Sequence, residues 1–185
     1  MKLKDNFTLY KYGLQVRLVN EGDAELIVSL RTSPLLSKYL NPINKDINVQ
    51  RKWIQKYKQR ENMGIEYYFV FSIDGVILGF ERIYNIEKDN FTHGSIIFLP
   101  KAPIGSSILA DIITREIAFE NLNKSLNFFD VRKGNTSVIN YHKKFNPELI
   151  VEDQDSLYFK LDRINFEKNK LFYLRIFNLL NSNKH

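Results

Sequence analysis

The alternation of apolar and polar residues at 14–18, LQVRL, predicts the first β-strand of the chain. The polar run from Asn20 to Asp23 is typical of a helix cap, so a helix is expected from there to about Arg31. Residues 48–62 predict an amphipathic helix, because apolar side chains recur there near helical spacing, at Val49, Trp53, Ile54 and Tyr57.

A three-stranded antiparallel meander follows this helix. Residues 65–73 and 76–86 both have the composition of strands, and Asp74-Gly75 between them is a strong signal for a type I′ hairpin turn. A polar loop at 87–90 then leads to a third apolar run at 91–99. These three strands form the most regular part of the sequence.

The remaining elements alternate between helix and strand. We expect, in order, a helix at about 105–121, a strand at 126–132, a short helix at 135–145, a strand at 156–164 and a helix at 166–180. An antiparallel half that continues into a β-α-β crossover predicts a mixed α/β sheet with helices on both faces. Its fourth and fifth strands should be parallel neighbours, within one domain over 1–185 whose residues 165–185 form a C-terminal helical extension.

Composition narrows the class of protein. The chain has 185 residues, is 44% hydrophobic and contains no cysteine, which suits a folded domain in a reducing, cytoplasmic compartment. Structural disulfides, thiolate zinc sites and cysteine nucleophiles are thereby excluded. Neither a signal peptide nor a membrane span is expected, because no apolar run is long enough. The three histidines, 93, 142 and 185, predict no metal site.

The formal net charge of +6 has two interpretations. It either keeps the protein soluble or reflects a preference for anionic ligands such as nucleotides and phosphates. No recognition helix or RNA-binding signature accompanies the scattered basic residues, so a nucleic-acid partner is not expected.

The segment LPKAPIGSSIL, residues 99–109, joins a strand to the start of a helix. Backbone N–H groups and the helix dipole favour a phosphate at such a junction, and Gly105 allows close approach of a ligand. An ordinary glycine near a helix start is the alternative interpretation.

With this order of elements, several short motifs resemble the GNAT superfamily of acetyl-CoA-dependent N-acetyltransferases. The resemblance covers Val16 to about Leu161 and is carried, in order, by RIY, GSII, APIGSS, AFENL, DVRKGN and NTSVINYHKKF. Within the superfamily, the chain looks most similar to acetyltransferases of amino sugars on nucleotide carriers, including those of pseudaminic-acid pathways.

The resemblance implies where acetyl-CoA binds. The superfamily's pyrophosphate loop, Q/R-x-x-G-x-G/A, falls on residues 102–107, where the basic or amide residue is missing and Ser107 replaces the second glycine. The preceding strand, from Ile96, would pair with the pantetheine arm and supply a backbone N–H to the thioester oxygen. The cofactor contacts implied in this way are Phe98, Leu99, Ile104, Gly105, Ser106, Ser107, Asn135 and Lys144.

The resemblance also implies catalytic residues. His142 occupies the position of a common superfamily tyrosine that protonates the leaving thiolate; an imidazole pKa of about 6.5 lies below a thiol pKa of about 8.5. Tyr141 competes for this role, and a packed or capping histidine is the structural alternative for His142. Glu81 and His93 lie on adjacent strands and are candidate bases that act through water. The alternative for Glu81 is a solvent-facing glutamate, and the alternative for His93 is a histidine at a strand end.

We therefore expect an acetyl-CoA-dependent N-acetyltransferase that works by direct attack of a primary amine in a ternary complex. The expected acceptor is a small molecule, an amino sugar on a nucleotide carrier. Acetylation of a protein N-terminus or another small amine is one alternative, and a GNAT fold that binds CoA or a partner without turnover is another. The apolar C-terminal helix should pack on the domain or on a second subunit, as in a homodimer.

Overall fold

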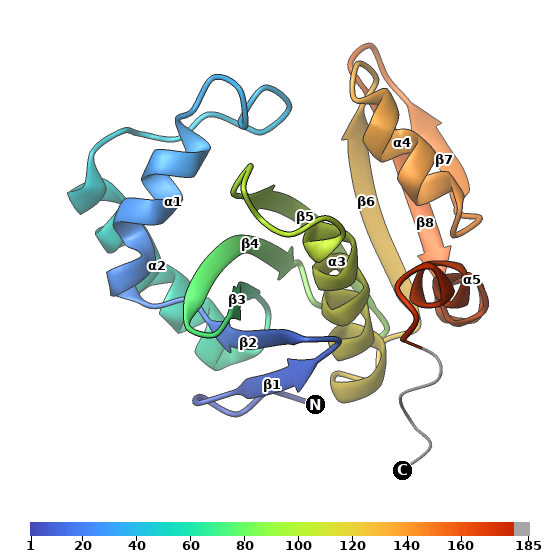
Figure 1. Ribbon diagram of the computed structural model, residues 1–185, viewed down its shortest axis with the longest axis horizontal. Helices are drawn as coiled ribbons and strands as arrows, with labels where there is room; N and C mark the ends of the chain where they lie inside the picture. The colour runs from blue at the N-terminus through green and yellow to red at the C-terminus, as the bar shows by residue number, and fades with distance from the viewer. Residues whose placement is uncertain (180–185) are drawn as a thin grey trace.

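One eight-stranded sheet runs through the molecule (Figure 1). The computed structural model describes residues 1–179, and in it the strand order is β1-β2-β3-β4-β5-β6-β8-β7. The strands are β1 (Thr8–Lys11), β2 (Leu14–Leu18), β3 (Tyr67–Ile73), β4 (Val76–Tyr84), β5 (Asn90–Phe98), β6 (Leu126–Arg132), β7 (Glu148–Glu152) and β8 (Ser156–Asp162). Only β5 and β6 pair in parallel, so the predicted mixed sheet with its parallel pair is confirmed.

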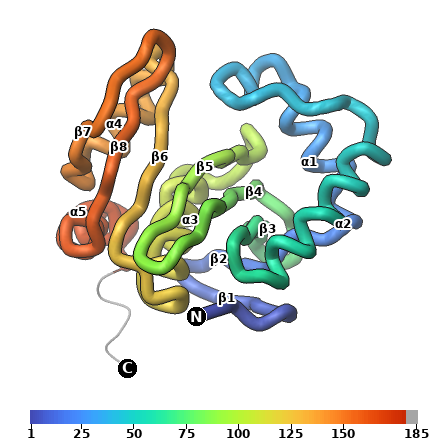
Figure 2. Tube along the Cα trace, turned by 180° about the vertical axis from the view of Figure 1, so that it is seen from behind, coloured from blue at the N-terminus to red at the C-terminus, as the bar shows by residue number. Residues whose placement is uncertain are grey.

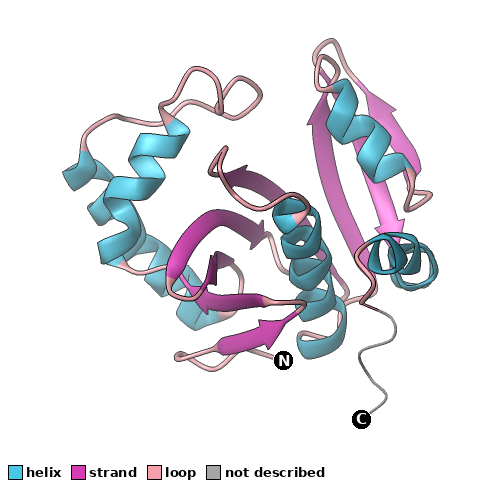
Figure 3. Cartoon of the chain, viewed as in Figure 1, coloured by secondary structure: helices cyan, strands magenta, loops and turns pink. Residues whose placement is uncertain are grey.

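Helices cover both faces of this sheet, as predicted (Figure 3). They are α1 (Ala24–Arg31), α2 (Ile47–Met63), α3 (Ser106–Glu116), α4 (Thr136–Lys143) and α5 (Arg163–Ile176), with short turns η1 (Glu21–Asp23) and η2 (Ile117–Asn121). Strand β3 is buried on both sides because its residues alternate between two cores. Tyr67 and Phe69 face the core that includes α3, whereas Tyr68 and Val70 face the core of α1 and α2.

Several predicted elements differ in detail. The hairpin at Asp74-Gly75 is confirmed, with positive φ angles of 48° and 78° at its two central residues. Strands β1 and β7 were not predicted. The helix expected at 105–121 is α-helical only to Glu116 and ends in the π-turn η2. The last helix begins at Arg163, so the strand before it is shorter than expected.

The C-terminal helix α5 packs on the domain itself. Phe166 is fully buried, and its ring lies 5.2 Å from that of Phe119 and 5.8 Å from that of Phe145. Lys170 Nζ lies 2.6 Å from Glu116 Oε1, which ties the helix to α3. The predicted helical extension beyond residue 179 lies outside the described residues. Within those residues, no helix has the length and apolar character needed to cross a bilayer.

Strands β5 and β6 separate shortly after they meet. Their pairing joins only Asn90–Thr92 to Leu126–Phe128, and beyond it the two strands diverge (Figures 1 and 2). On the other edge of β5, a β-bulge at Ser95, with φ of 58°, shifts the register against β4. Because bulges bend and twist a strand, this one turns β5 away at the point where the sheet divides.

Candidate active site

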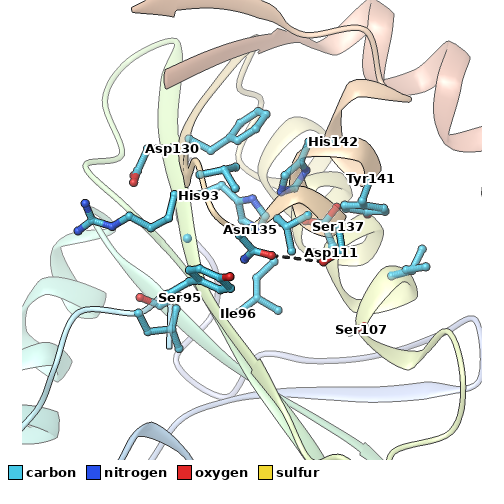
Figure 4. Close-up of a pocket in the computed structure, with 18 residues that line it drawn as sticks. His93, Ser95, Ile96, Ser107, Asp111, Asp130, Asn135, Ser137, Tyr141 and His142 are labelled. Atoms are coloured by element: carbon cyan, nitrogen blue, oxygen red, sulfur yellow. Dashed lines mark hydrogen bonds and ion pairs between the residues drawn. The ribbon is translucent and has the colours of Figure 1, made fainter. Parts of the chain in front are cut away.

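A cavity of about 450 Å³ fills the space between the diverging strands, and we call it the wedge cavity (Figure 4). It is lined by β5, the first turns of α3, the end of β6, α4 and the α1–α2 loop at Tyr39 and Leu40. Five of the residues predicted from the sequence line it, namely His93, Ser107, Asn135, Tyr141 and His142. The predicted crossover therefore brings residues from distant segments to one site.

A fully buried arginine, Arg115 of α3, lies beneath the wedge cavity. Its Nη1 donates to Asp111 Oδ2 at 2.6 Å and its Nε donates to Asn127 Oδ1 at 2.9 Å. Its Nη2 lies 3.3 Å from His93 Nδ1 and 3.2 Å from His142 Nδ1. Because arginine has only donors, both histidine Nδ1 atoms must accept, and each imidazole carries its proton on Nε2.

His142 is consequently neutral. Burial against Phe129, with the ring centroids 4.6 Å apart, and the nearby Arg115 charge hold the pKa of His142 well below 6.5. The imidazole is therefore neutral near pH 7 in this structure, and proton delivery by His142 stays a prediction. The side chain still lines the wedge cavity and offers Nε2–H as a hydrogen-bond donor.

His93 and Glu81 form a contact on the adjacent strands. His93 Nε2 meets Glu81 Oε1, and both side chains are almost completely buried. Burial, with Arg115 nearby, lowers the pKa of His93 to about 3, whereas burial raises the pKa of Glu81 to about 8 despite Arg115. Glu81 is completely buried, so the alternative of a solvent-facing glutamate is wrong, and it is not among the residues that line the wedge cavity.

Tyr141 is engaged with a carboxylate. Its hydroxyl donates to Asp111 Oδ2 at 2.5 Å, and burial together with the Asp111 charge raises the pKa of Tyr141 well above 10. The phenol proton therefore points to Asp111 in this structure.

The structure also brings Asp111 to the two residues that were predicted together on adjacent strands, Glu81 and His93. Glu81, His93 and Asp111 each bring one donor atom to within 4.8 Å of the others. The positive charge among them belongs to Arg115, which is bonded to Asp111. We therefore describe Glu81, His93, Asp111, Arg115 and His142 together as the buried cluster.

The loop predicted to hold pyrophosphate lies at the start of α3, and its residues differ in whether they face the cavity, the solvent or the backbone. Ser107 lines the wedge cavity, Ile104 is fully exposed, and the Ser106 hydroxyl donates to the Pro103 carbonyl oxygen at 2.7 Å. Gly105 has φ of 90°, and a Cβ there would lie 2.2 Å from the Phe177 ring. The glycine is therefore explained by its backbone and by α5, independently of any ligand.

Of the other predicted cofactor contacts, Asn135 lines the wedge cavity, whereas Phe98, Leu99 and Lys144 do not. Asn135 stands at the N-cap position of α4 and lines the wedge cavity, but its side chain makes no capping bond and instead accepts from Ser137 Oγ at 3.3 Å. Phe98 and Leu99 continue β5 beyond the cavity lining and pack against the two cores. Lys144 is exposed and does not line the cavity.

Sequence reasoning missed Asp111 and Arg115, the two charged residues of α3 at the site. All residues from Ala110 to Phe119 are buried. The available signal was the unusually apolar stretch ILADIITREIAF, because charged residues in a helix that is apolar on most sides are buried and paired.

A second pocket, of about 350 Å³, lies on the α1–α2 side of the sheet, and we call it the arginine pocket. Arg31 and Arg82 line it with Gln50, Trp53 and Tyr68, and no carboxylate is among its lining residues. Arg31 Nε and the Tyr68 hydroxyl are buried there without a hydrogen-bond partner among the described residues. Ser95 lines both this pocket and the wedge cavity, so the two meet at the β5 bulge.

Comparison with known proteins identifies similar structures. A solved structure described as a nucleotide-linked sugar GNAT, FdhC, is 33% identical, with a TM-score of 0.82 over 92% of this chain and 98% of that one. No protein-family model matches the chain, and no curated protein sequence does so significantly.

Two more distant structures share the fold. The N-acetyltransferase PseH of Campylobacter jejuni is 20% identical, with a TM-score of 0.63 over 82% of this chain and 99% of that one. A spermidine N-acetyltransferase of Vibrio cholerae, in complex with CoA and spermine, is 16% identical, with a TM-score of 0.69 over 85% and 99%.

The diverging strands, the bulge and the helix start beside the wedge cavity fit the acetyltransferase architecture that the sequence motifs implied. With the 33% identity to a sugar acetyltransferase over almost all of both chains, they lead to one conclusion. The chain belongs to the GNAT superfamily of N-acetyltransferases.

Proposed function

We propose that the enzyme transfers the acetyl group of acetyl-CoA to the amine of a nucleotide-linked amino sugar. The observation that carries this acceptor class is the 33% identity to the nucleotide-linked sugar GNAT. The arginine pocket supports it, because Arg31 has no carboxylate partner among the described residues and suits an anionic ligand, whereas Arg82 is paired with Glu66 at 2.6 Å. The same charge disfavours polyamine acceptors such as spermidine.

In this proposal the two substrates meet at Ser95. Acetyl-CoA occupies the wedge cavity, with its phosphates toward Ser107 at the start of α3 and its pantetheine arm along β5 and near Asn135. The acceptor occupies the arginine pocket, with its phosphates toward Arg31 and Arg82 and its amine toward the bulge. The amine then attacks the thioester carbon directly, within a ternary complex.

His142 has a defined role in this mechanism. Because its Nδ1 accepts from Arg115, its Nε2–H is the donor that we assign to the departing thiolate. This hydrogen bond strengthens as negative charge develops on sulfur, which is how such a donor lowers a barrier.

Acceptor class is tested by following thiol release from acetyl-CoA with four amines. These are a nucleoside-diphosphate amino sugar, the same amino sugar without its nucleotide, spermidine and a peptide with a free N-terminus. We expect turnover with the first, and kcat/KM at least about tenfold lower with the free sugar, since a hydrogen bond to a charged group contributes about 1.5–3 kcal/mol. Preference for spermidine or the peptide would overturn the acceptor class. Tight CoA binding without turnover on any amine would favour the inactive alternative.

Arg31→Gln tests the pocket itself. This change should raise KM for the nucleotide-linked acceptor about 10-fold or more and leave KM for acetyl-CoA nearly unchanged. Arg51→Gln is the matched control, because Arg51 is exposed on α2 and does not line the pocket. An equal effect of the two substitutions would remove the arginine pocket from acceptor binding.

A further inference from the structure

Asp111 lines the wedge cavity with Tyr141 and His142 (Figure 4), and its side chain is almost completely buried. We propose that Asp111 is a catalytic residue that takes a proton from the attacking amine and returns it to the departing thiolate. The inference rests on N-acetyl transfer by this chain and holds for any amine acceptor.

The two oxygens of Asp111 are in different environments. Oδ2 accepts from Arg115 Nη1 at 2.6 Å and from the Tyr141 hydroxyl at 2.5 Å, which fixes the carboxylate in place. Oδ1 is buried and has no hydrogen-bond partner among the described residues. His93 Nε2 lies 3.5 Å from Oδ1, but that nitrogen is engaged with Glu81. A buried acceptor without a donor is costly, so this unpaired oxygen is suited to receive a proton.

Burial also favours uptake of a proton by Asp111. It raises the pKa of Asp111, and Glu81 adds to this rise, whereas Arg115, His93 and the Tyr141 hydrogen bond oppose it. His142 is neutral on the same side. Because burial raises the pKa of Glu81 to about 8, the charges that remain in the buried cluster near neutral pH are those of Asp111 and Arg115.

Other ionisable groups at the cavity are less suitable as proton acceptors. His93 and His142 accept from Arg115 through Nδ1 and carry their protons on Nε2. The Tyr141 hydroxyl is already protonated and donates to Asp111. Asp130 also lines the cavity, but it is an exposed carboxylate on β6, with water available to it. Asp130 is therefore the rival that an experiment must separate from Asp111.

The proposed step balances in atoms and charge. The neutral amine attacks the thioester carbon, and a C–N bond forms while the carbonyl oxygen becomes an oxyanion and the nitrogen becomes positive. The N–H proton passes to Asp111 Oδ1. The C–S bond then breaks as the oxyanion collapses, and the proton moves from Asp111 to the thiolate. The products are the amide and CoA thiol, and Asp111 is ionised again.

Asp111→Asn keeps the size of the side chain and an oxygen that can accept from Arg115 and Tyr141. With acetyl-CoA and a nucleoside-diphosphate amino sugar, we expect kcat to fall about 100- to 10,000-fold, the usual contribution of a general acid–base group. KM for acetyl-CoA should change less than about threefold, because the interaction is used mainly after binding. Asp5→Asn, an exposed carboxylate far from the site in the sequence, is the matched control. Retention of kcat within about threefold in Asp111→Asn, or a larger loss in Asp130→Asn, would overturn the proposal.

Tyr141→Phe gives a second test that keeps Asp111 and does not depend on the folding of Asp111→Asn. Removing the hydroxyl takes away a hydrogen bond that lowers the pKa of Asp111, so this pKa should rise further. Because the ionised carboxylate is the active base, the acidic limb of kcat/KM should move to higher pH. An unmoved acidic limb in a folded Tyr141→Phe enzyme would contradict the proposal. A loss of rate at every pH would instead assign the proton transfer to Tyr141.

Discussion

At the scale of single residues, Arg115 determines the protonation of its neighbours. It is completely buried between the rings of Phe129 and Phe145, whose centroids lie 5.3 and 5.2 Å from its guanidinium carbon. Every one of its nitrogens has an acceptor nearby, so its orientation is fixed. Two histidines that would each titrate near pH 6.5 in water are held neutral by burial and by this one charge.

His142→Gln tests the neutral-donor role. We expect turnover to fall about 10- to 100-fold, corresponding to the loss of a hydrogen bond worth about 1.5–3 kcal/mol to a charged atom. Because the pKa of His142 lies well below 6.5, wild-type turnover should not fall as pH rises from about 6.5 to 8 through loss of a His142 proton. Steady-state rates across this range would check both points, with the exposed Asn140→Ala as control. A wild-type fall centred near pH 7 that disappears in His142→Gln would restore the imidazolium acid.

The sequence could predict several residues at the site, but not their chemistry. Ser107, Asn135, Tyr141 and His142 were predicted from motifs and His93 from its place on a strand, and all five line the wedge cavity. Asp111 and Arg115, by contrast, have the i,i+4 spacing of an ordinary surface ion pair. Only the packing of α3 under the sheet removes the pair from water, and protonation states depend on that burial.

At the scale of elements, helix α5 closes the core beneath α4. Phe166→Ala should lower the free energy of unfolding by about 3–5 kcal/mol, because the ring is fully buried against Phe119 and Phe145. Phe172→Ala is the matched control on the same helix; its side chain is 51% exposed, so the change should stay within about 1 kcal/mol. Urea denaturation of both variants would measure the difference. Equal effects would show that α5 does not pack as described.

The elements that escaped prediction are edge strands. Strand β1, TLYK, has no fully buried residue, and all five residues of β7 are exposed. Their pairing partners, β2 and β8, supply the backbone hydrogen bonds that make them strands. The alternation of apolar and polar residues indicates which side of a strand is buried. A strand that is held mainly by backbone hydrogen bonds to its neighbour has little of this alternation and is hard to predict. The buried strand β3, with five consecutive buried residues, was predicted well for the opposite reason.

At the scale of the whole molecule, the net charge of +6 includes two arginines that line the arginine pocket. Raising the salt concentration from about 0.05 to 0.5 M should increase KM for the nucleotide-linked acceptor several-fold, because exposed charges are screened over a shorter distance. KM for the same amino sugar without its phosphates should change much less. Initial rates at constant pH would test this. Equal salt effects on the two acceptors would indicate that the charge serves solubility.

The short join between β5 and β6 has a consequence for how the molecule unfolds. Three residue pairs are all the strand pairing that connects β1–β5 with β6–β8 among the described residues. Cooperativity between the two parts must therefore come from side chains that cross the gap, such as Arg115 on Asn127 and Phe119 on Phe166. A substrate seated in the wedge cavity touches both parts, so part of its binding free energy opposes their separation. We therefore expect amide hydrogen exchange in β6 and β8 to slow when the wedge cavity is occupied.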